Sequence, residues 1–189
     1  LDFLTAMNIE DGRVAGILAG ALPRIAALIE AIAPRFEAGG RVFQIGAGTS
    51  GRLAILDASE CKPTFDIERI IGVIAGGERA IVHSLENAED SEEAAARDLA
   101  PYQVGPNDTL IGIAASGSTP YVRGALLYAA TRHALTACIV NNAGGPLIAL
   151  ADHPIVLATG PEALTGSTRL KSGTAQKLAL NLISTGLMH

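Results

Sequence analysis

The sequence predicts an α/β fold, in which helices cover both faces of a five-stranded parallel sheet and a helical segment leads into it. Short apolar runs rich in Ile and Val alternate with helical stretches, which is the chain order of a parallel sheet and its covering helices. These runs are apolar throughout rather than at every second residue, as expected of strands covered on both faces. The chain has 189 residues, of which 49% are hydrophobic and 17% charged, so it can bury such a core.

The first part of the chain, residues 8–38, has the apolar spacing of two helices. Asn8 is the expected N-cap of the first helix. Pro23 suits the first turn of the second helix, where its missing N–H has no partner to lose. The glycine pair at 39–40 is expected to end that helix.

The strands and helices of the sheet follow in alternation. Strands are predicted at 41–45, 69–75, 109–114, 135–140 and 154–158. Helices are predicted at 50–61, 91–100, 120–133 and 172–188. Asp90 with Glu93, and Thr119 before Pro120, are the expected start signals of the second and third of these helices.

Two parts of the chain are therefore expected, a helical lead-in at 1–40 and a ligand-binding domain at 41–189. Leu1 is not a start residue, and the apolar spacing of the last helix still continues at Met188. We expect the chain to be a piece of a longer protein, cut at both ends.

Composition argues against several classes of protein. A net charge of −5 and 4% aromatic residues do not fit a nucleic-acid binder, which usually has a basic footprint. The longest uncharged run, 134–151, contains two asparagines and a Gly-Gly-Pro turn, so no membrane span is predicted. Two cysteines are too few for a disulfide framework, which favours a reducing, cytoplasmic location. The four histidines share no ligand spacing, and no metal is predicted.

Two loops that follow predicted strands resemble each other. Gly-Ala-Gly-Thr-Ser-Gly-Arg occupies 46–52, and Ala-Ala-Ser-Gly-Ser-Thr-Pro occupies 114–120. Each combines small residues and hydroxyls where a helix begins, an arrangement in which backbone amides and hydroxyls can bind a phosphate. Ligands of such sheets bind beyond the carboxyl ends of the strands. The residues predicted to bind the ligand here are Thr49, Ser50, Gly51, Ser116, Gly117, Ser118 and Thr119.

Other interpretations of these loops are weaker. Gly46, Gly48 and Gly51 satisfy the dinucleotide pattern, but the acidic residue expected at the end of the second strand is missing, and no redox cofactor is predicted. A third loop of hydroxyls and glycines at 164–174 carries Lys171, which could place a positive charge beside a phosphate or simply be solvated.

Carboxylates form two groups. Asp57 and Glu60 share one face of the helix that follows the first loop, and Cys61 beside them is interpreted as a buried small residue. Most carboxylates in the acidic run at 86–93 are expected to be a solvated face. Glu89 is the exception, because it precedes the expected helix start on a loop that follows the second strand.

At this point the residues resemble those of a known family, the N-acetylmuramic acid 6-phosphate etherases. The match extends in order along nearly the whole chain. Its motifs lie at 46–53, 56–61, 74–78, 88–91, 113–117 and 164–171.

The resemblance implies a cytoplasmic homodimer with a sugar-isomerase-type domain of flavodoxin-like topology. It implies cleavage of the lactyl ether of N-acetylmuramic acid 6-phosphate, a phosphorylated amino sugar, to N-acetylglucosamine 6-phosphate and D-lactate, without a cofactor, in recycling of cell-wall sugar. The two catalytic glutamates of the family fall on Glu60 and Glu89. Its phosphosugar contacts fall on Thr49, Ser50, Ser116, Gly117 and Ser118.

This chain departs from the family pattern in three places. Ser118 stands where the family commonly has arginine, and Asn-Asn-Ala-Gly at 141–144 replaces a Cys-Asn-Pro-Gly stretch. The connection at 64–69 is about two residues short. Separately, family members usually extend further at both ends, with a helical C-terminal piece that this chain lacks. The arginine difference concerns substrate detail, while both glutamates are kept.

The chemistry of that reaction suits two carboxylates. One can remove the C2 proton of the open-chain sugar, and the other can assist the departure of lactate from C3 before water adds. We assign the base to Glu89 and the acid to Glu60, and the reverse assignment stays open. Two other functions remain on the same fold: an aldose–ketose phosphosugar isomerase, and a regulator that binds a phosphosugar without turnover.

Overall fold

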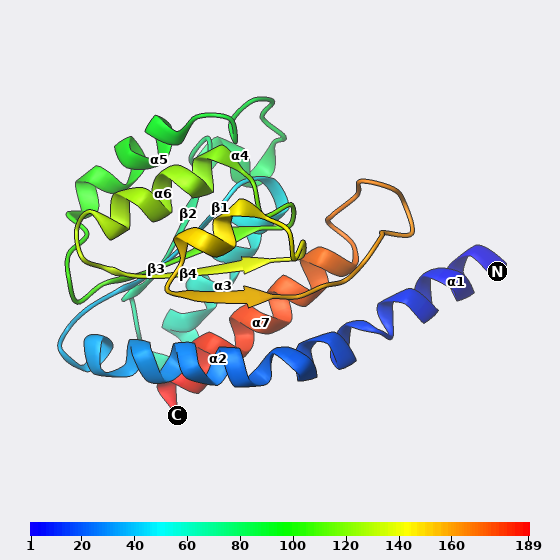
Figure 1. Cartoon of the computed structure of the whole chain (residues 1–189), viewed down its shortest axis with the longest axis horizontal. Coiled ribbons are helices and arrows are strands. Elements are labelled where there is room, and N and C mark those ends of the chain that lie inside the picture. The colour runs from blue at the N-terminus through cyan, green and yellow to red at the C-terminus, as the bar shows by residue number, and fades with distance from the viewer.

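The computed structural model describes all residues 1–189. Figure 1 shows a central sheet covered by helices, with α1 extending away from the body at the N-terminus. The elements in chain order are α1 Asp2–Asp11, α2 Val14–Glu37, β1 Val42–Gly46, α3 Gly48–Phe65, β2 Ile70–Ile74, α4 Glu78–Val82, α5 Glu92–Leu99, η1 Ala100–Tyr102, β3 Thr109–Ala114, α6 Pro120–Ala130, β4 Leu135–Val140, η2 Pro146–Leu150, β5 His153–Val156 and α7 Lys171–Met188.

The sheet has five strands in the order β2-β1-β3-β4-β5, and every neighbouring pair is parallel. β1 lies between β2 and β3, with Gly46 paired to Ile74 of β2 on one side and to Ile113 of β3 on the other. The predicted fold class is therefore confirmed, down to the flavodoxin-like strand order. All five strands end at the same edge, so the loops that follow them meet there.

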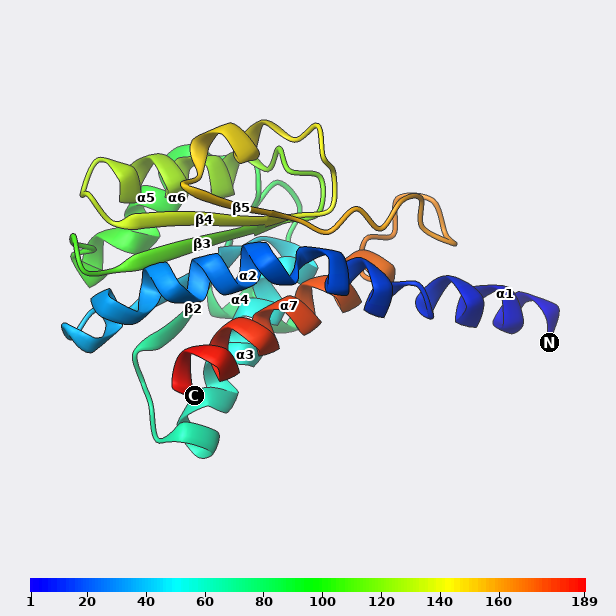
Figure 2. The ribbon, with the colours of Figure 1, turned by 60° about the horizontal axis from the view of Figure 1, so that its bottom comes forward.

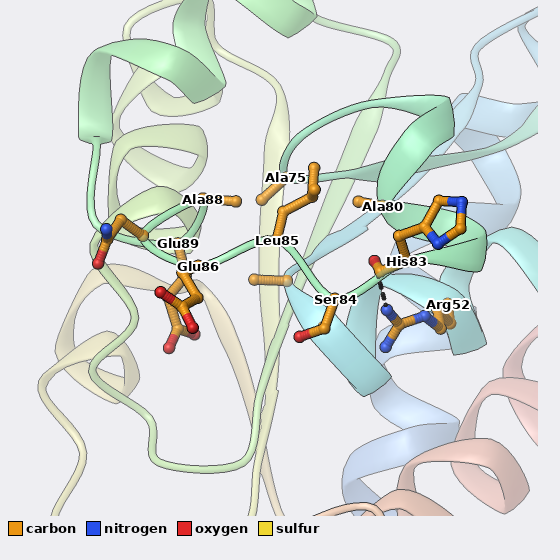
Figure 3. Close-up of a pocket in the computed structure, with 12 residues that line it drawn as sticks. Arg52, Ala75, Ala80, His83, Ser84, Leu85, Glu86, Ala88 and Glu89 are labelled. Carbon is orange, nitrogen blue, oxygen red and sulfur yellow. Dashed lines mark hydrogen bonds between the residues drawn. The ribbon is translucent and has the colours of Figure 1, made fainter.

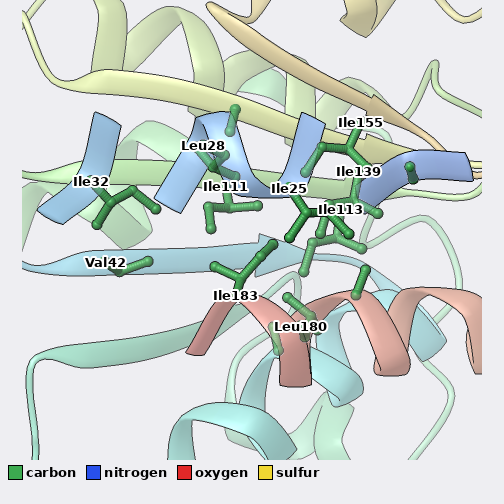
Figure 4. Close-up of a cluster of buried hydrophobic side chains, with 14 of the residues drawn as sticks. Ile25, Leu28, Ile32, Val42, Ile111, Ile113, Ile139, Ile155, Leu180 and Ile183 are labelled. Atoms are coloured by element: carbon green, nitrogen blue, oxygen red, sulfur yellow. The ribbon is translucent and has the colours of Figure 1, made fainter. Parts of the chain in front are cut away.

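Helices α2, α3 and α7 cover one face of the sheet (Figure 2). Ile25, Leu28 and Ile32 of α2 are buried against strands β3, β4 and β5 and against α7. Figure 4 shows these side chains converging with Ile111 and Ile183. The apolar face of α2 is thus part of the core, and its burial stabilises the domain.

Helices α5 and α6 cover the other face, together with η2. Tyr121, Val122 and Leu126 of α6 are fully buried against Phe43 and Leu110 of the sheet. The Tyr121 hydroxyl also donates a hydrogen bond of 2.6 Å to Asp98 of α5. Burial on both faces explains why the central strands β1, β3 and β4 are mostly apolar on both faces rather than at every second residue.

The prediction for the N-terminal helices was wrong in its boundary. The break falls at Gly12 and Arg13, and Pro23 lies inside α2 rather than in its first turn. Asn8 lies inside α1 and is not a cap. Buried residues occur on α2 both before and after Pro23. Their packing against the core keeps the chain helical at Pro23, although proline has no N–H to donate to the helix.

Two further local predictions need correction. The cap of α5 is Ser91, whose hydroxyl accepts from the Ala94 N–H at 3.1 Å, rather than Asp90. The short helix α4 was not predicted, because its five residues give too little periodicity to detect.

Helix α1 has no buried residue, whereas Phe3, Leu4 and Ile9 on it are exposed. By length and composition alone, the stretch Asp2–Glu37 could cross a membrane, a test that core helices of soluble proteins also pass. Burial in the domain core accounts for part of that apolar character, because α2 places Val14, Ala21, Ile25, Leu28, Ile32 and Phe36 in the core.

Candidate functional site

The site lies where β1 and β3 are neighbours and their chain connections leave in opposite directions. β1 continues to β2 on one side, and β3 continues to β4 on the other. This is the switch point at which open α/β sheets bind ligands. The loops that follow β1 and β3 are the two that the sequence singled out, and here they lie side by side.

A cavity of about 290 Å³ opens between these loops. Thr49 and Ser50 line it from the first loop, and Ser116 and Thr119 line it from the second. Glu89 enters from the loop before α5, and Thr168 from the loop before α7. The cavity, which we call the hydroxyl cavity, thus collects hydroxyls from three loops and one carboxylate.

The first turn of α3 faces this cavity without a side-chain cap. Its N-cap residue, Ala47, offers no hydrogen-bonding side chain, so the first amides of the helix are free to bind an anion. Gly51 does not line the cavity. A Cβ at Gly51 would lie 2.5 Å from Ile74 Cγ1 and 2.6 Å from the Gly46 carbonyl oxygen, so this glycine allows α3 to approach the sheet.

The Ser50 hydroxyl belongs to a buried chain of hydrogen bonds. It donates to Gln176 Oε1 of α7 at 2.9 Å, and Gln176 Nε2 donates to Asn141 Oδ1 at 2.9 Å. Asn141 Nδ2 in turn donates to the Leu157 carbonyl at 3.0 Å. This chain ties the first loop to α7 and to the ends of β4 and β5, which fixes the Ser50 side chain in place.

The second loop makes a tight turn at Gly117, where φ is +72°. A Cβ there would lie 2.9 Å from the Gly145 Cα, so the position requires glycine on both grounds. The turn leaves Ser116 exposed, and the Ser118 N–H and hydroxyl both donate to Ser116 Oγ at 3.2 Å. Ser118 supports Ser116 in this structure and does not itself line the hydroxyl cavity.

The loop that carries Glu89 is hydrogen-bonded to α6 near Glu89 and to α3 near its beginning. The Tyr121 N–H of α6 donates to the Glu89 carbonyl at 2.9 Å. At its other end, Arg52 of α3 donates to the Ile81 carbonyl at 2.9 Å and to the His83 carbonyl at 3.0 Å, the second of which Figure 3 shows. Glu89 is therefore presented beside both hydroxyl loops by a loop whose backbone is anchored.

A second cavity, of about 210 Å³, adjoins the first and shares Ala47, Gly48 and Glu89 with it. Glu86 also lines it, so we call it the acidic cavity (Figure 3). Leu85 and Ala88 are half-buried beneath the loop, and the glutamate that follows each of them is exposed.

Glu60 lies elsewhere in the single chain. It is exposed on α3 and lines a cavity of about 310 Å³ with Leu56, Asp57, Lys177 and other residues of α3 and α7. Asp57 on the same helix is buried, accepting from Gln44 at 2.7 Å and from Ser184 at 3.0 Å. Within one chain, Glu60 and Glu89 therefore line different cavities.

Lys171 lies at the start of α7 and is almost completely buried. Its ammonium group pairs with Glu10 of α1, and this contact lowers the pKa of the Glu10 carboxyl. The helix start itself is occupied by Glu162, which accepts from the Lys171 and Ser172 amides at 3.0 and 2.9 Å. Lys171 does not line the hydroxyl cavity; Thr168 does so from the same loop.

The two cysteines are buried residues of the core and are not reactive thiols. Burial raises the pKa of the Cys61 thiol, and separately that of Cys138, to about 11, which leaves little thiolate at neutral pH. No cluster of three or more His, Cys, Asp or Glu side chains that could hold a metal ion occurs in the structure.

Comparison with known families adds two overlapping matches. The model of the SIS domain matches residues 79–185, and the model of the glucokinase regulatory protein N-terminal SIS domain matches residues 24–130. Each match covers more than half of the chain and includes the Glu89 loop. Both assign the fold observed here.

Curated relatives match almost the whole chain. An N-acetylmuramic acid 6-phosphate etherase of Porphyromonas gingivalis is 52% identical over 99% of this chain and 69% of its own length. One from Streptomyces avermitilis is 54% identical over 98% of this chain and 60% of its own length. The chain thus spans about 60–69% of the length of these two relatives.

Among solved structures, a phosphoheptose isomerase from Francisella tularensis superposes with a TM-score of 0.74. The superposition covers 99% of this chain and 97% of that one, at 20% sequence identity. Similarity at this level shows a shared fold.

Proposed function

This chain belongs to the family of N-acetylmuramic acid 6-phosphate etherases, and we propose that it carries their activity: cleavage of the lactyl ether to give D-lactate and N-acetylglucosamine 6-phosphate. Identity of 52% over 99% of the chain supports this assignment at the level of the whole sequence. At the level of the site, the observation that carries it is the hydroxyl cavity, in which Glu89 adjoins Ser50 and Ser116.

In this proposal the phosphate binds in the hydroxyl cavity. The uncapped first turn of α3 supplies amide N–H groups, and Thr49, Ser116 and Thr119 supply hydroxyl donors. Ser50 can join them if its proton turns from Gln176 to the phosphate. Lys171, whose charge is paired with Glu10, is assigned to holding α1 against α7 rather than to the substrate.

Glu89 acts as the general base. The aldehyde of the open-chain sugar acidifies the proton on C2, and the Glu89 carboxylate removes it. Lactate then leaves from C3, with a proton supplied by an acid, and gives an unsaturated aldehyde. Water adds to C3 and a proton returns to C2, so that the ether bond is exchanged for a hydroxyl and no electrons are gained or lost.

Glu60 is the proposed acid, and a homodimer would bring it to the site. It lies apart from Glu89 in one chain, but it is exposed beside Leu56, which is itself 46% exposed. A second copy that covers this surface would bury the apolar side chains and could receive Glu60 in its own Glu89 site. We further propose a cytoplasmic location, which agrees with two buried, unpaired cysteines.

D-lactate release tests the function most simply. The full-length protein should release D-lactate from N-acetylmuramic acid 6-phosphate and none from unphosphorylated N-acetylmuramic acid, because the phosphate anchors the substrate. A phosphosugar isomerase would instead interconvert an aldose and a ketose, and a regulator would bind without turnover. Binding with no lactate release would favour the regulator.

Replacing Ser116 by alanine should weaken phosphosugar binding. Loss of one hydrogen bond to a charged group costs about 1.5–3 kcal/mol, which is roughly a ten- to hundredfold higher Kd. Calorimetric titration with N-acetylglucosamine 6-phosphate measures this change. Thr131→Ala, an exposed hydroxyl at the far end of α6, is the matched control and should bind as the wild type does. Equal Kd values for Ser116→Ala and the wild type would remove Ser116 from the site.

The homodimer has its own test. Sedimentation of the full-length protein at micromolar concentration should give a dimer mass. Leu56→Glu places a charge on the exposed surface beside Glu60 and should shift the protein toward monomer. A wild-type monomer at this concentration would contradict the proposed dimer.

A further inference from the structure

The acidic cavity contains a second glutamate that the assignment above does not use. Glu86 and Glu89 both line it, and in Figure 3 their side chains extend from the loop to the same side. They are three residues apart in the sequence, and Asn87, one of the two residues between them, turns the backbone with a φ of +60°. The anchors at Arg52 and Tyr121 hold this loop at both ends.

Neither carboxylate has an ion-pair or hydrogen-bond partner in the structure, and this separates them from other acidic residues nearby. Glu92 pairs with Arg123 at 2.6 Å, and Glu93 accepts from the Ser91 hydroxyl at 3.0 Å. Arg52 is the only Lys or Arg that lines the acidic cavity, and its guanidinium donates to backbone carbonyls. Glu86 is therefore an unpartnered acceptor facing a cavity next to the proposed phosphate site.

The two adjoining cavities favour opposite parts of one ligand. A phosphate dianion is stabilised by the hydroxyl and amide donors of the hydroxyl cavity. Glu89 lines both cavities, and Glu86 adds a second carboxylate in the acidic cavity, where it repels an anion. An ionised carboxylate has acceptor oxygens only, so its natural partners are O–H and N–H donors. The sugar part of a phosphosugar supplies such donors.

We propose that Glu86 binds hydroxyl groups of the sugar and thereby selects a polyhydroxylated ligand, while Glu89 performs proton transfer. The inference rests on the proposed function, because it takes the phosphate to lie in the hydroxyl cavity. It assigns Glu86 as a substrate-binding residue that holds the sugar in the ground state and in the transition state alike. The sugar hydroxyls then determine which phosphorylated ligands bind tightly, while the phosphate contributes the binding that all of these ligands share.

Titration calorimetry with two probes tests this role without requiring turnover. Glu86→Gln should raise the Kd for N-acetylglucosamine 6-phosphate about tenfold or more, since a charge-assisted hydrogen bond becomes a neutral one. The same variant should leave the Kd for inorganic phosphate unchanged or lower it, because a negative charge near the anion is removed. Glu78→Gln, an exposed glutamate on α4 outside both cavities, is the matched control. Thermal unfolding of each variant confirms that the fold is retained.

Steady-state kinetics then separates binding from catalysis. Glu86→Gln should raise KM with kcat within about threefold of the wild type, the pattern of lost ground-state binding. An unchanged Kd for the phosphosugar, or a hundredfold loss of kcat at unchanged KM, would overturn the proposal. If the wild type releases no D-lactate but Glu86→Gln still weakens phosphosugar binding selectively, the proposed function fails and this inference stands. If the wild type binds no phosphosugar, both fail.

Discussion

Glu89→Gln is expected to abolish most D-lactate formation while leaving phosphosugar binding intact. The substitution keeps the size of the side chain but removes its ability to accept a proton, and positioned general bases contribute about 10²–10⁴-fold to rate. The Glu89 backbone stays anchored by its carbonyl, which accepts from the Tyr121 N–H whatever the side chain. The measurement is kcat for lactate release, with Glu78→Gln as the control.

Deuterium exchange identifies which proton Glu89 moves. In deuterium oxide, Glu89→Gln should fail to exchange the C2 proton of N-acetylglucosamine 6-phosphate, because the base is missing. Exchange at the wild-type rate in this variant would show that another group removes the C2 proton. In that case Glu89 would take the role of the acid, and the assignment of the two glutamates would be reversed.

Glu60→Gln is expected to lose a similar fraction of lactate release but to keep C2 exchange, since the base remains. The Glu60→Gln variant also tests whether Glu60 acts across the dimer interface. If Glu60 from one copy serves Glu89 of the other, a heterodimer of Glu60→Gln and Glu89→Gln contains one intact site and one site with both changes. Such a heterodimer should recover about half of the wild-type dimer activity, by the symmetry of the assembly.

Co-expression of the two variants with different affinity tags provides this heterodimer. No recovery above the two parent variants would mean that both glutamates act within one chain. The surface beside Leu56 would then have to rearrange to bring Glu60 to the site.

The sheet and its active edge could be predicted because they depend on strong local signals. The strands at Thr109–Ala114 and Leu135–Val140 are found at the predicted residues, since both are short runs dominated by apolar residues that alternate with helical stretches along the chain. The two hydroxyl loops follow β1 and β3, and the strand order alone then brings Ser50 and Ser116 to one cavity.

Other features depend on contacts between distant segments, and sequence patterns do not contain those. The start of α2 is set by packing of Val14 and Ala21 into the core, which overrides the signal of Pro23. Lys171 was expected near the phosphate, but its pairing with Glu10 joins residues 161 positions apart. Thr168 and Glu86 line the two cavities but were not predicted as site residues. Each lies in a segment that the sequence did single out, Thr168 in the third hydroxyl-rich loop and Glu86 in the acidic run.

The fate of the C2 proton during turnover tests the central claim most directly. The full-length protein, incubated with N-acetylmuramic acid 6-phosphate in deuterium oxide, should yield D-lactate together with N-acetylglucosamine 6-phosphate that carries one solvent deuterium at C2. That result requires removal and return of the proton that Glu89 is proposed to abstract. D-lactate formed with the original proton retained at C2 would contradict elimination, and no D-lactate at all would contradict the etherase activity.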